Sequence, residues 1–158
     1  MYWNQAAETM PRESLRALQL ERLQETIRHC YQNVPMYRQR MDAIGMLPED
    51  VRRLEDLRKL PFTVKTDLRD HYPYGLLAVP MKDVVRVHAS SGTTGKPIVA
   101  GYTKGDLDMW SEVVARICAA AGVTDEDVVQ ISFGYTLFTG AFGLHYGLEK
   151  LGAAIIPI

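Results

Sequence analysis

The sequence has 158 residues, of which 47% are hydrophobic and 23% are charged, and its 18 basic and 19 acidic side chains give a formal net charge of -1. This composition is typical of a globular protein with a buried core, and it excludes a disordered tail. No run of lysine or arginine is long enough for nucleic-acid binding, and no apolar stretch approaches the ~20 residues that span a bilayer. The two cysteines, Cys30 and Cys118, each lie in an apolar helical pattern. Buried reduced thiols and a cytoplasmic protein are therefore expected.

Residues 1–80 predict a helical segment, which is the first of two expected domains. Between Pro11 and Tyr31, apolar side chains recur on one side of a 3.6-residue helix. A second short helix is expected between Pro48 and Pro61, since acidic residues follow the first proline and the second proline stops the helix. Thr63 is expected to cap a third helix, which ends before the proline-rich residues 73–80.

From residue 81 onwards, strand and helix patterns alternate along the chain. Strands are expected at residues 84–89, 97–103, 127–133 and 153–158, with helices after Thr103 and over residues 138–152. The helix after Thr103 should bury one face that includes Ile117, and the strand at 127–133 should be buried. This order predicts a parallel or mixed α/β sheet, so residues 81–158 are expected to form the start of an α/β domain. No helix follows the last strand to cover it, which favours the opening portion of a larger protein.

Eight consecutive residues between the first two strands contain only glycine, hydroxyl side chains, lysine and proline, namely Ser90, Ser91, Gly92, Thr93, Thr94, Gly95, Lys96 and Pro97. Glycines let backbone N–H groups turn to one side, and hydroxyls and a lysine add donors and charge, so the segment predicts a polyphosphate site. The phosphate loop of nucleotide hydrolases fits poorly, because it needs four residues between its glycines and a serine or threonine after its lysine. A hairpin loop without a ligand and a non-catalytic phosphate-binding or interaction module stay open as alternatives.

The motif "SSGTTGKP" resembles the phosphate-loop signature of the adenylate-forming superfamily, although the common acyl-CoA version places its lysine after the proline. Together, "HASSGTTGKPIVAGYT", "LPFTVKTDLRDHYPYGLLAVP" and "FGYTLFTGAFGLHYGLEKLGA" resemble the phenylacetate-CoA ligase family, and the resemblance covers essentially the whole chain. It implies an N-terminal helical segment followed by part of the mixed-sheet large domain of adenylate-forming enzymes. It also implies a ligase that uses ATP, Mg²⁺ and coenzyme A, with a small carboxylic acid as substrate. A homodimer is left open, and neither nucleic acid nor membrane is implied as a partner.

The resemblance also implies which residues form the site. Ser90, Ser91, Gly92, Thr93, Thr94, Gly95 and Lys96 would hold the β- and γ-phosphates of ATP. The aromatic rings of Phe133, Tyr135 and Phe138 follow a predicted strand, where α/β sheets usually build ligand sites, and they would line the acid pocket unless they only pack the core. His88 and His145 lack neighbours at metal-ligand spacing and are expected to be structural, and no metal ligand is assigned. The hinge, magnesium ligand and catalytic lysine of the family have no counterpart before Ile158, so the chain is expected to be inactive alone.

Overall fold

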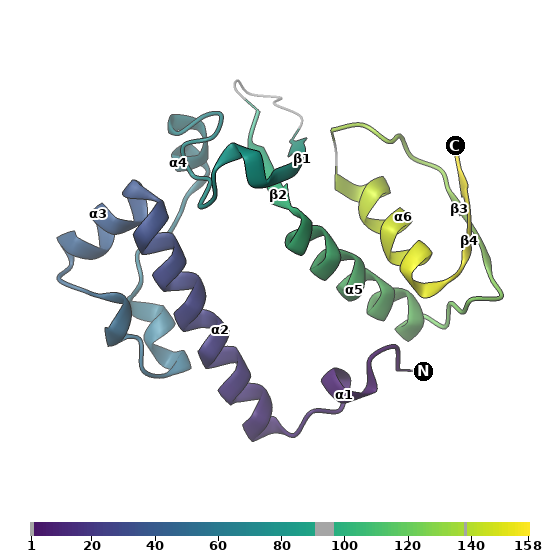
Figure 1. The fold of residues 1–158 in the computed structure, drawn as a ribbon, viewed down its shortest axis with the longest axis horizontal. Helices are drawn as coiled ribbons and strands as arrows, with labels where there is room; N and C mark the ends of the chain where they lie inside the picture. Colours follow the sequence, from purple (N-terminus) through teal and green to yellow (C-terminus); the bar gives the residue numbers. More distant parts are fainter. Residues whose placement is uncertain (1, 91–96, 138) are drawn as a thin grey trace. The chain divides into compact units, whose positions relative to one another are not determined.

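The structure, a computed structural model, describes residues 2–90, 97–137 and 139–158. The chain divides into two compact units, one formed by Met10–Pro80 and the other by Met1–Thr9 together with Met81–Ile158. The first is helical and the second combines helices with strands (Figure 1), as the α/β expectation required. Among the described residues, no helix combines the length and the hydrophobicity needed to cross a bilayer.

The unit Met10–Pro80 is organised around the long helix α2 (Arg12–Asn33). The predicted amphipathic face is confirmed, because Ile27 is buried with Leu23 and Tyr31 packed beside it. The helix ends where expected, but a further helix, α3 (Pro35–Ala43), begins at once and was not predicted. Proline is well suited to the first position of a helix, where its missing N–H group costs no hydrogen bond. The same proline therefore stops one helix and starts the next.

The single helix predicted between Pro48 and Pro61 is wrong. This segment instead forms two 3₁₀ turns, η1 (Pro48–Asp50) and η2 (Leu54–Lys59). The Asp56 carboxylate accepts hydrogen bonds from the backbone N–H groups of Arg52 and Arg53, each at 3.1 Å. These bonds hold Arg53 in an extended conformation, with φ -151° and ψ 159°, so a continuous helix cannot pass through it.

The helix α4 (Lys65–Asp70) is present, but Thr63 does not cap it. The Thr63 hydroxyl instead donates a hydrogen bond to the Tyr37 hydroxyl at 2.9 Å. The first turn is closed by Asp67, whose carboxylate accepts the backbone N–H of Val64 at 2.8 Å. Asp67 also binds both terminal nitrogens of Arg40, at 2.8 and 2.6 Å. This two-pronged ion pair connects α3 to α4 and lowers the pKa of Asp67 from 3.8 to about 2.

Replacing Asp67 with asparagine is expected to lower the melting temperature of the chain by a few degrees at pH 7, because the amide carries no charge to pair with Arg40. A carboxylate whose pKa is lowered by folding stabilises the protein above its unfolded pKa, near 3.8, and loses that effect as the pH falls through about 2. The difference in melting temperature between wild type and Asp67→Asn should therefore become smaller between pH 4 and pH 2. Thermal melts in a pH series measure it. Asp70→Asn, at the exposed end of the same helix, is the control, and an equal effect there would contradict the assignment.

The second unit contains the strands β1 (Val84–Ala89), β2 (Val99–Thr103), β3 (Val128–Ile131) and β4 (Ala154–Pro157). It also contains the helices α1 (Gln5–Glu8), α5 (Lys104–Ala120) and α6 (Thr139–Leu151), and a 3₁₀ turn, η3 (Met81–Asp83). Among the described residues the strands do not join into one sheet. β1 pairs antiparallel with β2, and β3 pairs parallel with β4.

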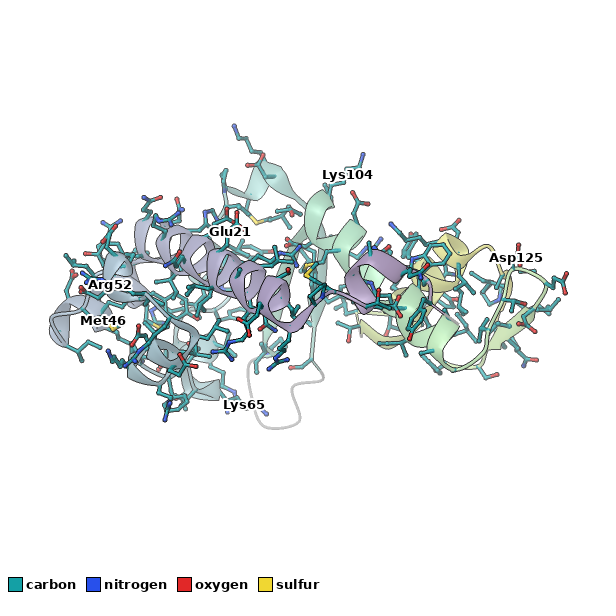
Figure 2. The ribbon with its side chains drawn as sticks, turned by 90° about the horizontal axis from the view of Figure 1, so that it is seen from below. Glu21, Met46, Arg52, Lys65, Lys104 and Asp125 are labelled. Carbon is teal, nitrogen blue, oxygen red and sulfur yellow. The ribbon has the colours of Figure 1, made fainter. Side chains whose placement is uncertain are left out.

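Helix α5 begins where the sequence predicts. The Thr103 hydroxyl accepts the backbone N–H of Asp106 at 3.2 Å, and the Asp106 carboxylate accepts the backbone N–H of Thr103 at 2.8 Å. This reciprocal pair satisfies two N–H groups of the first turn. Figure 2 marks Lys104 at the start of the helix and Asp125 in the turn beyond its far end. Gly122 follows the helix with a φ of +96°, a left-handed conformation that favours glycine at a helix C-terminus.

Helices α5 and α6 lie side by side and enclose the core of this unit (Figure 1). Two glycines of α6 make the close approach possible. A Cβ atom on Gly147 would lie 2.5 Å from the Cβ of Val114, and one on Gly143 would lie 2.7 Å from the Trp110 ring. The smooth glycine side predicted for α6 is therefore confirmed at these two positions. Ile117, expected on the buried face of α5, is exposed instead, because Ala115, Cys118 and Ala119 fill the contact with α6.

Strand β3 is less buried than its apolar sequence predicts. Of its four residues only Ile131 is buried, and Val128 is exposed. A parallel strand is buried when further strands and helices cover it. Within the described residues, β3 has β4 as its only strand neighbour, so the other edge of β3 has no strand paired with it there.

The first residues of the chain are fastened to α5 by Glu112. Its carboxylate accepts hydrogen bonds from the Trp3 indole and the Asn4 amide, both at 3.0 Å. Arg116 donates to the same carboxylate at 3.0 and 3.1 Å. These donors, above all Asn4 and Trp3, lower the pKa of Glu112 to about 2. Residues 2–9 therefore belong with the α5–α6 pair although 71 residues (10–80) of the other unit follow them.

Candidate functional site

The base of the predicted phosphate loop is closed by two hydrogen bonds between Ser90 and Ile98. The Ser90 backbone N–H donates to the Ile98 carbonyl at 2.9 Å, and the Ile98 N–H donates to the Ser90 hydroxyl oxygen at 3.2 Å. They continue the β1–β2 ladder one step beyond the pairing of Ala89 with Val99. Ser90 is exposed at this base. The other six predicted phosphate ligands, Ser91, Gly92, Thr93, Thr94, Gly95 and Lys96, lie outside the described residues, as does Phe138.

A hollow of ≈ 180 Å³ lies beside this base. Its walls come from the ends of both strands and from the first residue of α6, and they are lined by His88, Ala89, Ser90, Ile98, Ala100 and Thr139. Most of these side chains are apolar or small. The hollow therefore places an apolar surface next to the point where the loop leaves the sheet.

The segment 133–137, which contains two of the three aromatic residues predicted to line the acid pocket, is attached to the end of β1. The Leu137 carbonyl accepts the Ala89 backbone N–H at 3.0 Å and is 2.9 Å from Nδ1 of His88. A second attachment lies further back, where the Tyr135 hydroxyl is 3.0 Å from Nδ1 of His145 on α6. The structure thus brings this segment to the strand that leads into the phosphate loop, as expected for a site at the ends of strands.

The two described aromatic candidates of this segment differ in their environment. The Phe133 side chain is 46% exposed. Tyr135 is half-buried, packs against the α5–α6 core and contacts the Phe142 ring edge-on at 5.2 Å. Core packing therefore accounts for Tyr135, whereas Phe133 has no such role. Phe133 is the described candidate that is free to contact a ligand.

His88 lies at the centre of an aromatic cluster and is only 2% exposed. Three rings meet its own ring at steep angles, with centroid distances of 5.5 Å to Tyr102, 5.7 Å to Trp110 and 5.8 Å to Phe142. A carbonyl can only accept, so Nδ1 of His88 must carry the hydrogen of the bond to Leu137. Nε2 has no hydrogen-bond partner among the described residues. The sequence predicts structural roles for His88 and His145. It does not predict that both side chains form hydrogen bonds with the segment 133–137.

The positively charged Arg86 side chain contacts rings of the same region. The Arg86 guanidinium is 4.5 Å from the centroid of the Tyr146 ring and 5.2 Å from that of Phe142. Arginine stacked on aromatic faces keeps its charge and its donors. Arg86 therefore connects β1 to α6, two residues before His88 in the same strand.

Mg²⁺ was expected together with ATP. Within residues 2–90, 97–137 and 139–158, no three histidine, cysteine or acidic side chains are grouped so that they could hold a metal ion. Both cysteines are free, Cys118 buried and Cys30 partly so, and burial raises the pKa of each thiol. The described side chains therefore do not form a metal centre, and we assign no step to Mg²⁺.

No protein-family model matches the chain. It is, however, 56% identical over 151 residues to the phenylacetate-coenzyme A ligase of Escherichia coli (strain K12). The aligned residues cover 96% of this chain and 35% of that protein. It is 55% identical over 158 residues to the phenylacetate-coenzyme A ligase of Thermus thermophilus. This alignment covers 100% of this chain and 36% of that protein. The chain thus spans about a third of the length of the curated relatives it matches.

Solved structures give the same result for the fold. A crystal structure of 2-hydroxyisobutyryl-CoA ligase in complex with 2-HIB-AMP and CoA, in the thioesterification state, matches with a TM-score of 0.91 and 32% identity. It covers 99% of this chain, and this chain covers 34% of it. The same ligase in the postadenylation state matches with a TM-score of 0.89 and 31% identity. The expected resemblance to CoA ligases is therefore confirmed in sequence and in fold.

Proposed function

We propose, since this chain belongs by sequence to the phenylacetate-CoA ligase family, that it supplies the phosphate loop and part of the acid pocket of an ATP-dependent aryl acid CoA ligase. The observation that carries the proposal is the identity of 55–56% to such ligases over 96–100% of the chain. The structure adds that the predicted acid segment is hydrogen-bonded to His88 and Ala89 of β1, directly before Ser90 at the loop base.

The proposed reaction has two steps. A carboxylate oxygen of the aryl acid attacks the α-phosphorus of ATP, and the bond from that phosphorus to the bridging oxygen of pyrophosphate breaks, which leaves an acyl adenylate. The thiol of coenzyme A, with loss of its proton, then attacks the acyl carbon and displaces AMP. No group is transferred to the protein. Its contribution is to position the reactants and stabilise the charge on the departing pyrophosphate.

In this proposal the loop residues Ser90, Ser91, Gly92, Thr93, Thr94, Gly95 and Lys96 bind the β- and γ-phosphates. The anchored base at Ser90 and Ile98 supports this role, because it fixes both ends of a short loop. Donors held in place before the reaction stabilise a developing charge better than donors that must first move. The use of ATP and CoA is supported by the adenylate and CoA named with 2-hydroxyisobutyryl-CoA ligase. Mg²⁺, a cytoplasmic location and a homodimer stay predictions.

The direct test is ATP–pyrophosphate exchange that depends on an aryl acid. It should be measured with this chain and with the longest reading frame that contains it, using phenylacetate, a substituted phenylacetate and benzoate. Exchange in the longer protein only would support the proposal and the expectation that residues 1–158 are inactive alone. Exchange in neither protein with any of these acids would contradict it, and phosphate binding without acid dependence would favour a non-catalytic binding module.

Replacing Phe133 with alanine in the longer protein is expected to raise the KM for the aryl acid about tenfold, since an aromatic contact buried on binding is worth roughly 1–2 kcal/mol. Thermal stability should hardly change, because the ring is 46% exposed and lies outside the core. Tyr135→Ala is the matched comparison and should lower the melting temperature, since it opens the α5–α6 core. The test measures the KM for the aryl acid and the melting temperature of both variants. An unchanged KM for the acid in Phe133→Ala would show that Phe133 is not part of the pocket.

A further inference from the structure

We propose that His88 is a positioning residue that holds the acid-binding segment 133–137 against the base of the phosphate loop, through the hydrogen bond from its Nδ1 to the Leu137 carbonyl. This inference rests on the proposed function and adds to it a residue that links the two halves of the site. It assigns His88 a role in substrate binding, which sequence reasoning did not.

The Leu137 carbonyl is the point at which the two parts of the site meet. It accepts two hydrogen bonds from consecutive residues of β1, one from the Ala89 backbone at 3.0 Å and one from the His88 side chain at 2.9 Å. The next residue, Ser90, closes the loop base with Ile98. The last two residues of β1 therefore hold the acid segment, and the residue that follows them closes the loop base. Of the two bonds to the Leu137 carbonyl, only the one from His88 uses a side chain, so it is the one that substitution can remove.

The surroundings of His88 fix the orientation of that donor. The ring is 2% exposed and is enclosed by Tyr102 of β2, Trp110 of α5 and Phe142 of α6. Rings from three elements thus restrict the rotation of the imidazole about its side-chain bonds. Nδ1 donates to the Leu137 carbonyl, and Nε2 has no hydrogen-bond partner within residues 2–90, 97–137 and 139–158. An unpaired buried polar atom has a cost in stability, so a residue chosen for packing alone would be apolar.

The consequence for binding follows from where Leu137 lies in the segment. It comes four residues after Phe133 and two after Tyr135, and α6 begins at Thr139. Without the His88 bond, only the Ala89 backbone N–H ties the end of the segment to β1. The segment would then be ordered in part by the bound acid, and the free energy of ordering would reduce the apparent affinity for it. The base formed by Ser90 and Ile98 keeps its own two hydrogen bonds, so ATP binding should be much less affected.

The experiment compares three substitutions in the longest reading frame that contains the chain, after exchange has been established for the parent protein. His88→Asn places an amide nitrogen where Nδ1 was and keeps the donor. His88→Gln carries its amide further out, where Nε2 was, and His88→Phe keeps a flat ring without a donor. His29→Phe is the control, since His29 is an exposed histidine whose Nδ1 lies 3.1 Å from the side-chain amide nitrogen of Asn33. KM values for the aryl acid and for ATP, kcat and melting temperature are measured for each.

The acid KM should rise about tenfold in His88→Gln and His88→Phe, in line with the loss of one buried hydrogen bond, and stay within about threefold of the parent in His88→Asn. The ATP KM should change by less than about twofold in all three. If His88→Phe does not fold, the Asn–Gln comparison still tests the donor. A purely structural role would lower kcat and melting temperature with both KM values unchanged and no rescue by asparagine, and would overturn the proposal. A parent protein without exchange would overturn the proposed function itself, whereas an active parent with unchanged acid KM overturns only the role of His88.

Discussion

Replacing Gly147 with alanine is expected to lower the melting temperature of the chain by about 5–10 °C, from a net destabilisation of roughly 2–3 kcal/mol. In an open helix the same change would stabilise, because alanine has the higher helix propensity. Here the new methyl group would lie 2.5 Å from Cβ of Val114 and 3.2 Å from the backbone nitrogen of Ala115. These atoms belong to the body of α5 and cannot rotate away, so the two helices must move apart and the core between them loses contacts.

Gly105→Ala is the matched control, since it makes the same chemical change in the first turn of α5. The nearest atom to a new Cβ there is the Thr103 hydroxyl oxygen at 3.8 Å, which is ordinary van der Waals contact. This variant should melt at the same temperature as wild type or slightly above it. Thermal unfolding followed by circular dichroism measures both. A Gly147→Ala protein as stable as Gly105→Ala would show that α5 and α6 are not held as closely as described.

Replacing Lys96 with methionine in the longer protein is expected to reduce acid-dependent ATP–pyrophosphate exchange about 100-fold. The proposal places Lys96 beside the β- and γ-phosphates, where it offsets the charge of the departing pyrophosphate. Removal of one such electrostatic contact at a reacting centre commonly costs 10²- to 10³-fold in rate. Methionine keeps most of the length of the side chain and removes the charge together with the N–H donors. The measurement is the exchange rate at saturating ATP and acid, together with the KM for each.

Lys104→Met is the control for that experiment. Lys104 is exposed at the first position of α5, directly after β2. Its replacement therefore removes an equal charge from the same unit. Exchange should stay within about twofold of the parent, which is the scale of a screened surface charge. Equal losses in the two variants would mean that overall charge, rather than a contact with the phosphates, determines the rate.

Much of the fold could be predicted because the relevant signals are local. The apolar period of α2, the Thr103–Asp106 pair that starts α5 and the glycines of α6 each act within a few residues. The errors arose where side chains compete with the backbone or where partners are distant. Asp56 turns a predicted helix into two 3₁₀ turns by binding backbone N–H groups. The strands were expected in one sheet, but strand partners are not encoded locally.

The sequence predicts a chemistry for the candidate site, which stays a prediction, but it does not predict the connections between the residues of that site. The composition of the loop indicated phosphate, and the aromatic run after β3 indicated an apolar ligand. Nothing in the spacing of His88 and Leu137, 49 positions apart, indicated that they would share a hydrogen bond. The same holds for the different exposure of Phe133 and Tyr135, which depends on how α6 packs. Such contacts depend on tertiary structure, which a pattern read along the chain does not contain.

The placement of the two tryptophans makes the two units separable by spectroscopy. Trp3 is bound to Glu112, and Trp110 lies against Gly143, so both indoles belong to the unit that contains α5 and α6. The unit Met10–Pro80 contains tyrosine and phenylalanine but no tryptophan. Indole emission therefore follows the unfolding of one unit alone, while far-ultraviolet circular dichroism follows the helices of both units, α2 of one and α5 and α6 of the other. Coincidence of the two transitions in a denaturant titration would make the chain a single cooperative system, and separation would give each unit its own free energy of unfolding.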